Sequence, residues 1–206
     1  MLKARIAVLV SGGGTNLQAL IDAEKAGILK SGSIVLVVSG KEGAYALKRA
    51  EENGIKTVTI PKKGIHQEEF EQKLIKVLDD YGADLIILAG FMSILSGEFT
   101  SYYRNKIINV HPALIPSFCG KGYYGIKVHE EALKYGVKVT GATVHYVNEI
   151  PDGGKIILQK AVSVSAKDTP ETLQRKVMRQ AEWKILPLAA EKVCREIIRN
   201  KKSDEV

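Results

Sequence analysis

Short runs of apolar residues alternate, over the first 88 residues, with longer segments whose apolar residues recur at helical spacing. The apolar runs occupy residues 5–10, 34–38, 57–60 and 85–88. Helical segments follow them: one with Leu17, Leu20, Ile21 and Ile28 on one stripe, one over 44–53 and one over 70–81. Continuous apolar strands separated by amphipathic helices are typical of a parallel sheet covered by helices on both faces. We therefore predict an α/β, Rossmann-like fold with a mostly parallel sheet.

The pattern changes in the C-terminal half. After an expected strand at 107–110 and a short helix at 129–134, residues 142–147 alternate between apolar and polar side chains. The turn sequence at 151–154 then precedes another apolar run at 156–158. This arrangement predicts an antiparallel hairpin at the edge of the sheet.

The last helix has a clear start signal. Thr169 is a capping hydroxyl and Pro170 suits the first helical position. We expect this helix to bury Leu173, Val177 and Leu188, and we expect Pro187 to kink or divide it. Residues 201–206 are expected to fray.

Composition favours one folded unit. The 206 residues are 45% hydrophobic and 26% charged, which are ordinary globular proportions. We expect a single domain over 1–206, a monomer or homodimer. The sequence shows no apolar run long enough to span a membrane, and its first residues do not resemble a secretion signal. We therefore expect no membrane association and a cytoplasmic location. The spacing of Cys119 and Cys194 predicts reduced thiols, with neither a disulfide nor a metal knuckle.

The net charge of +7 favours anionic partners. Its basic residues form isolated pairs such as Lys62–Lys63, without a basic block interleaved with aromatic side chains, so we expect no nucleic-acid partner. Phosphorylated metabolites are anions that suit the positive net charge as well as nucleic acid does. The spacing of the four histidines matches no metal-ligand motif, and we expect no metal.

Residues 11–16, Ser-Gly-Gly-Gly-Thr-Asn, join the first strand to the first helix. Their backbone N–H groups and the positive end of the helix converge on one point, which favours the binding of a single phosphate. The GxGxxG spacing fails at Leu17, and no Gly-Lys-Ser/Thr sequence follows, so NAD and ATP are disfavoured. The alternative is a glycine turn that only reverses the chain.

Asn109 and His111 stand two residues apart near the end of a predicted strand, so their side chains project from one face. An amide beside an imidazole can stabilise an oxyanion and move a proton, which acyl transfer requires. Asp152 has the chemistry to orient the histidine. The alternatives are that the pair only satisfies loop backbone and that Asp152 only closes its own turn; His145 is interpreted as structural.

Together these segments resemble the folate-dependent phosphoribosylglycinamide formyltransferases of purine synthesis. The resemblance rests on residues 8–18, 88–92, 109–116 and 152–154, and it covers about residues 4–190. It implies transfer of a formyl group from 10-formyltetrahydrofolate to the amine of glycinamide ribonucleotide, directly through a tetrahedral intermediate. The catalytic set implied is Asn109, His111 and Asp152.

The resemblance also implies two binding sets. The substrate set is Gly13, Gly14, Thr15, Asn16, Arg179 and Glu182. The folate set is Phe91, Met92, Ser93, Ile94, Leu95, Val147, Asn148, Glu149, Ile150 and Pro151. Ser93 stands where the family often carries arginine, and His129 aligns with a family histidine.

Three alternatives share part of this pattern. A formyltetrahydrofolate hydrolase or a methionyl-tRNA formyltransferase would share the Asn-His-Asp set, but each resembles a longer chain with a further domain, for which we expect no room in 206 residues. A non-catalytic phosphate-binding module would explain the glycine loop alone.

Overall fold

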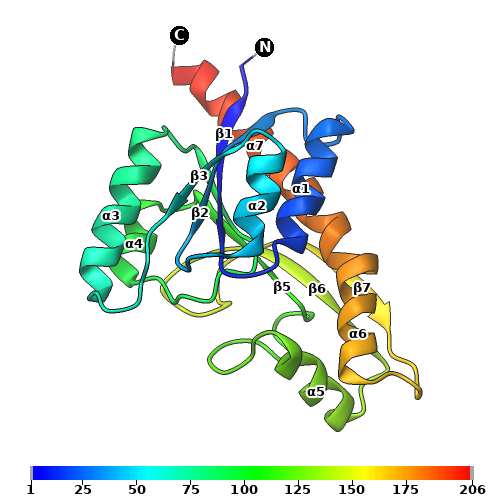
Figure 1. Ribbon diagram of the computed structural model, residues 1–206. Helices are drawn as coiled ribbons and strands as arrows, with labels where there is room; N and C mark the ends of the chain where they lie inside the picture. The colour runs from blue at the N-terminus through cyan, green and yellow to red at the C-terminus, as the bar shows by residue number, and fades with distance from the viewer. Residues whose placement is uncertain (1, 205–206) are drawn as a thin grey trace.

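The computed structural model describes residues 2–204 and shows a sheet flanked by helices (Figure 1). The strands are β1 (Ala4–Val10), β2 (Gly32–Ser39), β3 (Lys56–Thr59), β4 (Leu85–Leu88), β5 (Ile107–His111), β6 (Val139–Tyr146) and β7 (Ile156–Ser163). The helices are α1 (Thr15–Lys25), α2 (Tyr45–Glu52), α3 (Gln67–Asp80), α4 (Gly97–Tyr102), α5 (Ile126–Tyr135), α6 (Pro170–Val177), the π-helical turn η1 (Met178–Glu182) and α7 (Trp183–Asp204).

The sheet order is β3-β2-β1-β4-β5-β6-β7. Strands β1 to β5 pair in parallel, whereas β6 pairs antiparallel with both β5 and β7. The predicted Rossmann-like sheet with an antiparallel edge is confirmed. Strand β7 extends beyond the expected 156–158, because an edge strand exposes one face and continues through polar residues such as Gln159 and Lys160.

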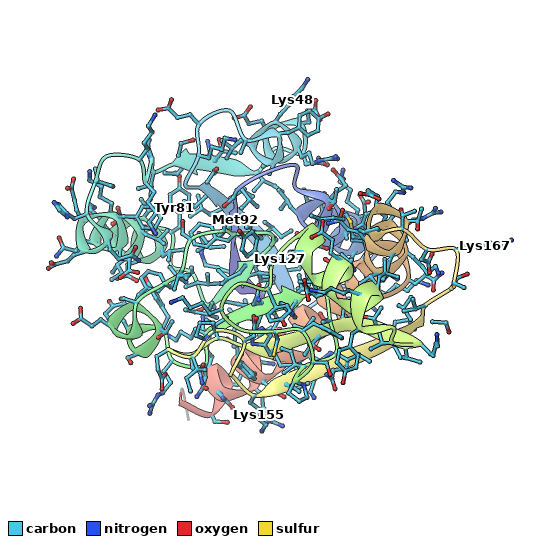
Figure 2. The ribbon with its side chains drawn as sticks, turned by 90° about the horizontal axis from the view of Figure 1, so that it is seen from below. Lys48, Tyr81, Met92, Lys127, Lys155 and Lys167 are labelled. Carbon is cyan, nitrogen blue, oxygen red and sulfur yellow. The ribbon has the colours of Figure 1, made fainter. Side chains whose placement is uncertain are left out.

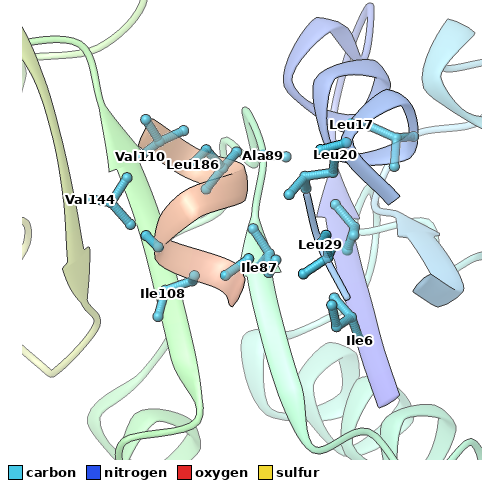
Figure 3. Packing of buried hydrophobic residues seen from close by; sticks show 14 of the residues in the cluster. Ile6, Leu17, Leu20, Leu29, Ile87, Ala89, Ile108, Val110, Val144 and Leu186 are labelled. Carbon is cyan, nitrogen blue, oxygen red and sulfur yellow. The ribbon is translucent and has the colours of Figure 1, made fainter. Parts of the chain in front are cut away.

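Alternate strand residues face two separate hydrophobic clusters. Ile6, Val8 and Val10 of β1 pack under α1 and α7 on one face of the sheet, together with residues such as Leu20 and Leu186 (Figure 3). Ala7 and Leu9 point to the other face, where α3 and α4 cover them. Both faces of the central strands are therefore buried, which explains their unbroken apolar sequence. Among the described residues, no helix has the length and hydropathy to cross a membrane.

Several local expectations were wrong. Helix α1 ends at Lys25, which leaves Ile28 outside it and 49% exposed, and Leu188 is 50% exposed instead of buried. Helix α4 was not predicted, because its six residues are too few to show a period; Ser96 caps it by accepting a hydrogen bond from the Phe99 N–H. Helix α6 begins after Thr169 as expected, with a complete capping box.

The C-terminal helix also differs from expectation. We expected Pro187 to kink or divide the last helix. The regular α-helix is instead interrupted at η1, and α7 continues through Pro187. Residues 201–204 are helical instead of frayed, and the Lys201 Nζ lies 2.6 Å from the Asp84 carboxylate, which ties this end of α7 to the sheet. Residues 205–206 of the expected tail lie outside the described residues.

The close approach of β6 and β7 makes Gly141 sensitive to substitution. A Cβ at this position would lie 2.1 Å from the Lys160 carbonyl oxygen, which belongs to the partner strand. We expect Gly141→Ala to lower the free energy of unfolding by about 2 kcal/mol or more, because the strands must separate to admit the methyl group. Urea denaturation checks this. Gly12→Ala is the control, since a Cβ there meets nothing within 4 Å; equal losses in the two variants would contradict the prediction.

Candidate active site

The parallel strands β1, β4 and β5 end at one edge of the sheet, and a cleft of about 670 Å³ opens there. Figure 2 shows the molecule from the side at which these strands end, with Met92 and Lys127 near the centre and Lys48, Lys155 and Lys167 at the periphery. The carboxyl edge of such a sheet is where α/β folds place their ligands. The cleft lining comes from residues 90–94, 109–112 and 120–125, together with Asn16, His129, Pro151, Asp152, Gln174, Met178 and Glu182.

Asp152 stands between two buried histidines. Its Oδ2 lies 3.4 Å from the His111 Nδ1, and its Oδ1 lies 3.5 Å from the His145 Nε2. The Gly120 N–H also donates to the Asp152 Oδ2, at 2.8 Å. Asp152 has φ +57°, a left-handed conformation that an aspartate tolerates in a tight turn. The fold therefore brings Asp152 into contact with His111, which lies 41 residues earlier in the chain.

These contacts change the pKa values of Asp152 and His111. Burial raises the pKa of the Asp152 carboxyl, but the two histidines and the Gly120 N–H outweigh it and lower that pKa below its usual range. Burial lowers the pKa of His111, opposed by the Asp152 carboxylate and by the Phe118 carbonyl. The His111 Nε2 donates to that carbonyl at 2.8 Å. With an acceptor at each ring nitrogen, the hydrogen bonds of His111 are complete only in its protonated form.

Strand register aligns Asn109 with His145. The two residues are opposite each other in the antiparallel β5–β6 pair, and the Asn109 Nδ2 lies 3.3 Å from the His145 Nε2. The His145 Nδ1 donates to the Tyr146 carbonyl at 2.8 Å, so the Nε2 accepts from Asn109 when the ring is neutral and donates to Asp152 when the ring is protonated. His145 thus links Asn109 to Asp152. Interpreting it as a purely structural residue missed this position, and the only signal in the sequence was its place on an alternating strand.

His129 is a further buried histidine in the cleft wall. It is fully buried, and neither of its ring nitrogens has a hydrogen-bond partner among the described residues. Burial, reinforced by His111, lowers the pKa of His129 to about 4, so the ring is neutral near pH 7. It lies in the first turn of α5, where it follows the glycine-rich loop that borders the cleft.

The glycine loop reaches the cleft through Asn16. The Asn16 Nδ2 donates to the Glu182 Oε2 at 2.8 Å, which joins the start of α1 to η1. The Ser11 Oγ accepts from the Met92 N–H at 3.0 Å and ties the same loop to the segment after β4. Gly14, at φ +70°, directly precedes α1, so the helix N-terminus follows immediately on the loop.

The structure brings together most of the residues implied by the resemblance. Residues of the three sets that line the cleft are Asn16, Phe91, Met92, Ser93, Ile94, Asn109, His111, Pro151, Asp152 and Glu182. Residues outside its lining are Gly13, Gly14, Thr15, Leu95, Val147, Asn148, Glu149, Ile150 and Arg179. Arg179 is exposed and lines a separate groove with Arg175 and Lys184, whereas Glu182, at the end of the π turn, is buried at the cleft.

Comparison with known proteins agrees with this geometry. The formyl transferase family model matches residues 4–190. Phosphoribosylglycinamide formyltransferase of Escherichia coli strain K12 is 41% identical over 184 residues, which are 89% of this chain and 84% of that protein. The human trifunctional purine biosynthetic protein adenosine-3 is 46% identical over 93% of this chain, but this chain spans only 18% of its length.

Solved structures show the same fold. Glycinamide ribonucleotide transformylase 1 from Symbiobacterium toebii superposes with a TM-score of 0.87 at 37% identity, covering 94% of this chain and 89% of that one. Phosphoribosylglycinamide formyltransferase from Brucella melitensis has a TM-score of 0.85 at 40% identity, covering 93% and 96%.

The buried carboxyl of Glu182 predicts a pH-dependent stability. Burial raises its pKa from 4.5 to about 7, although the Asn16 hydrogen bond opposes this. A raised pKa in the folded state stabilises the fold below pH 4.5, and that contribution is lost as the pH rises toward about 7. We expect the parent to lose up to about 3 kcal/mol of unfolding free energy relative to Glu182→Gln between pH 4.5 and 8. Urea denaturation across this range measures it.

The exposed Glu130 provides the matched control. Glu130→Gln removes the same charge from the surface and is expected to keep the pH profile of the parent. A Glu182→Gln variant whose stability parallels that of the parent at every pH would contradict the assignment.

Proposed function

The chain belongs to the formyl transferase family, and we propose that it is a phosphoribosylglycinamide formyltransferase, which moves the formyl group of 10-formyltetrahydrofolate to the amine of glycinamide ribonucleotide in de novo purine synthesis. One observation carries the proposal beyond the family: Asn109 and His111, both on β5, meet Asp152, from the turn after β6, in one cleft. An amide donor, an imidazole and a partly buried carboxylate are groups suited to formyl transfer to an amine.

Two regions of the cleft suit the two small-molecule substrates. The N-terminus of α1, with Asn16 at the cleft wall, is suited to the ribonucleotide phosphate, because backbone N–H groups and the helix dipole favour an anion there. Glu182, bonded to Asn16, is suited to a hydroxyl of the ribose. Phe91 and Ile94, which also line the cleft, supply apolar surface for the pterin.

The reaction begins when the substrate amine attacks the formyl carbon. The carbonyl electrons move to oxygen, and the resulting oxyanion is stabilised by the Asn109 amide and by protonated His111. In the structure the His111 Nε2–H donates to the Phe118 carbonyl. The proposal therefore requires this hydrogen bond to break, so that the N–H can donate to the substrate oxyanion instead. Asp152 orients the His111 ring, and its charge opposes the lowering of the His111 pKa by burial, which favours the protonated form.

The intermediate then collapses. The oxyanion re-forms the carbonyl, the bond from the formyl carbon to the folate nitrogen breaks, and the proton released by the attacking amine passes to that nitrogen through water in the cleft. The products are the formylated ribonucleotide and tetrahydrofolate. The atoms and electrons of these reaction steps balance without a metal.

The variants His111→Ala and Asp152→Asn test the catalytic roles. We expect each to lower kcat by about 10²-fold or more, because the first removes the proton-bearing donor and the second removes the charge that stabilises it. The KM for the ribonucleotide should change little, since its phosphate is held elsewhere. Steady-state kinetics measure both. His66→Ala, at an exposed histidine, is the control; unchanged kcat in both cleft variants would refute the roles.

The phosphate region is tested at Gly14. Its φ is +70°, and a Cβ there would lie 2.6 Å from the Ala46 Cβ, so a larger residue must shift the loop. We expect Gly14→Val to raise the KM for the ribonucleotide by about tenfold or more while the KM for the folate changes little. Gly12→Ala, in open space, should preserve both. Equal losses for the two substrates would count against a phosphate site here.

A product assay distinguishes the candidate activities. The protein is incubated with glycinamide ribonucleotide and 10-formyltetrahydrofolate, and formylated ribonucleotide and free formate are both quantified. Formylated product that depends on the ribonucleotide supports transfer. Formate released at the same rate without the ribonucleotide would instead indicate a hydrolase, and the absence of both products would indicate a binding module.

A further inference from the structure

Residues 91–96 form an irregular segment between β4 and α4, and its first four residues line the cleft. Phe91 and Leu95 pack in the hydrophobic cluster under α3 and α4, which lie on the same side of the sheet (Figure 1). Met92 and Ile94 are 58% and 69% exposed, so core packing does not fix their side chains. The positions of these two cleft residues therefore depend on how the backbone of the segment is held.

A buried carboxylate on α3 holds the end of this segment. Glu71 is 6% exposed, and its Oε1 accepts a hydrogen bond from the Ser96 N–H at 2.7 Å. Its Oε2 accepts from the Ser96 Oγ at 2.5 Å. The same Ser96 Oγ accepts from the Phe99 N–H at 3.1 Å. Glu71 therefore fixes the point at which the segment ends and α4 begins.

Gln67, one helical turn before Glu71, reaches the middle of the segment. Its Nε2 donates to the Ile94 carbonyl at 3.0 Å and also to the Glu71 carboxylate. Near the other end of the segment, the Met92 N–H donates to the Ser11 Oγ at 3.0 Å. The backbone is thus held at residues 92, 94 and 96, and the last two of these contacts come from α3.

The chemistry of Glu71 is unusual for its place on α3. The other buried residues of this helix, Phe70, Leu74 and Leu78, are apolar. A buried carboxylate costs hydration free energy unless donors compensate it, whereas an apolar side chain at this position would add to the core. The donors to Glu71 are Ser96 and Gln67, the two residues that join α3 to the segment or end it. Because satisfied buried networks fix one geometry, the carboxylate serves the segment and not the helix.

We propose that Glu71 and Gln67 are positioning residues for the folate co-substrate. Neither residue lines the cleft. They hold the 91–96 segment so that the Met92 and Ile94 side chains cover the pterin, and they make no contact with the reacting atoms. This role rests on the proposed function and extends the folate site to α3, where the resemblance implied no residue.

The affinity for a folate measures this role directly. In Glu71→Gln the side chain keeps its size but loses one acceptor oxygen, and Gln67→Leu removes the amide that holds the Ile94 carbonyl. We expect each variant to raise the Kd for tetrahydrofolate by about fivefold, because a displaced wall loses apolar contact with the ligand. Equilibrium dialysis measures the Kd, and since tetrahydrofolate is the reaction product, the measurement does not require catalysis.

Steady-state kinetics distinguish positioning from a loss of folded protein. In both variants the KM for 10-formyltetrahydrofolate should rise by about fivefold, while kcat and the KM for the ribonucleotide stay within about twofold of the parent values. A purely structural role would instead lower the concentration of active enzyme, which reduces the apparent kcat and leaves both KM values unchanged.

The exposed face of α3 supplies matched controls. The Gln72 Nε2 donates to the Glu68 Oε1 at 3.2 Å, and both of these residues are exposed. Glu68→Gln and Gln72→Leu therefore repeat the two chemical changes on the same helix. Both control variants are expected to keep the folate affinity and the kinetic constants of the parent.

Amide hydrogen exchange reports the hydrogen bonds themselves. Without any ligand, Glu71→Gln should speed the exchange of the Ser96 N–H by about tenfold, because a hydrogen bond to a carboxylate is replaced by a weaker one. The amides of β1 should exchange as they do in the parent, which shows that the fold is retained.

Unchanged exchange at Ser96 overturns the proposal, because Glu71 then does not hold the segment. Faster exchange with the folate affinity of the parent also overturns it, as does an equal rise in the KM of both substrates or the same loss in the control variants. A parent protein that binds tetrahydrofolate but forms no formylated product refutes the proposed function alone, since the Kd still measures the positioning role. A parent protein that binds no tetrahydrofolate refutes both.

Discussion

The contact between Asp152 and the imidazoles of His111 and His145 is the interaction on which the cleft depends. A carboxylate with little solvent access is stable only when charge and hydrogen bonds compensate its lost hydration. The two imidazoles, at 3.4 and 3.5 Å, and the Gly120 N–H provide that compensation. The same contacts join β5, β6 and the turn after β6 into one rigid wall, so the geometry for chemistry and the stability of the sheet edge have a common origin.

Strand β6 makes this possible because it runs opposite to β5. Antiparallel pairing places His145 directly across from Asn109, and the turn that follows β6 returns Asp152 to the end of β5. A parallel strand at this position would require a long crossover connection. The antiparallel pairing therefore allows the short connection after β6 that carries Asp152 to His111 and His145.

The two sides of the segment from α6 to α7 have different chemistry. Glu182 is buried toward the cleft beside Asn16, whereas Arg179 and Arg175 face outward along the groove. The π turn η1 alters the helical phase between them, which is a common feature of helices near functional sites. A regular helical period would place Arg179 and Glu182, three positions apart, on one face. The resemblance grouped the two residues by their positions before Leu186 and Pro187.

The sequence alone determined the layered fold, because apolar periodicity reflects burial and burial is set by which face of each element meets the core. It also indicated the glycine loop and the Asn109–His111 pair, whose significance depends on spacing along one strand. Only the tertiary structure decided the position of Asp152, the bridging place of His145, the short α4 and the outward direction of Arg179. These depend on contacts between segments distant in the chain and on one altered helical turn, and local sequence spacing carries no information about either.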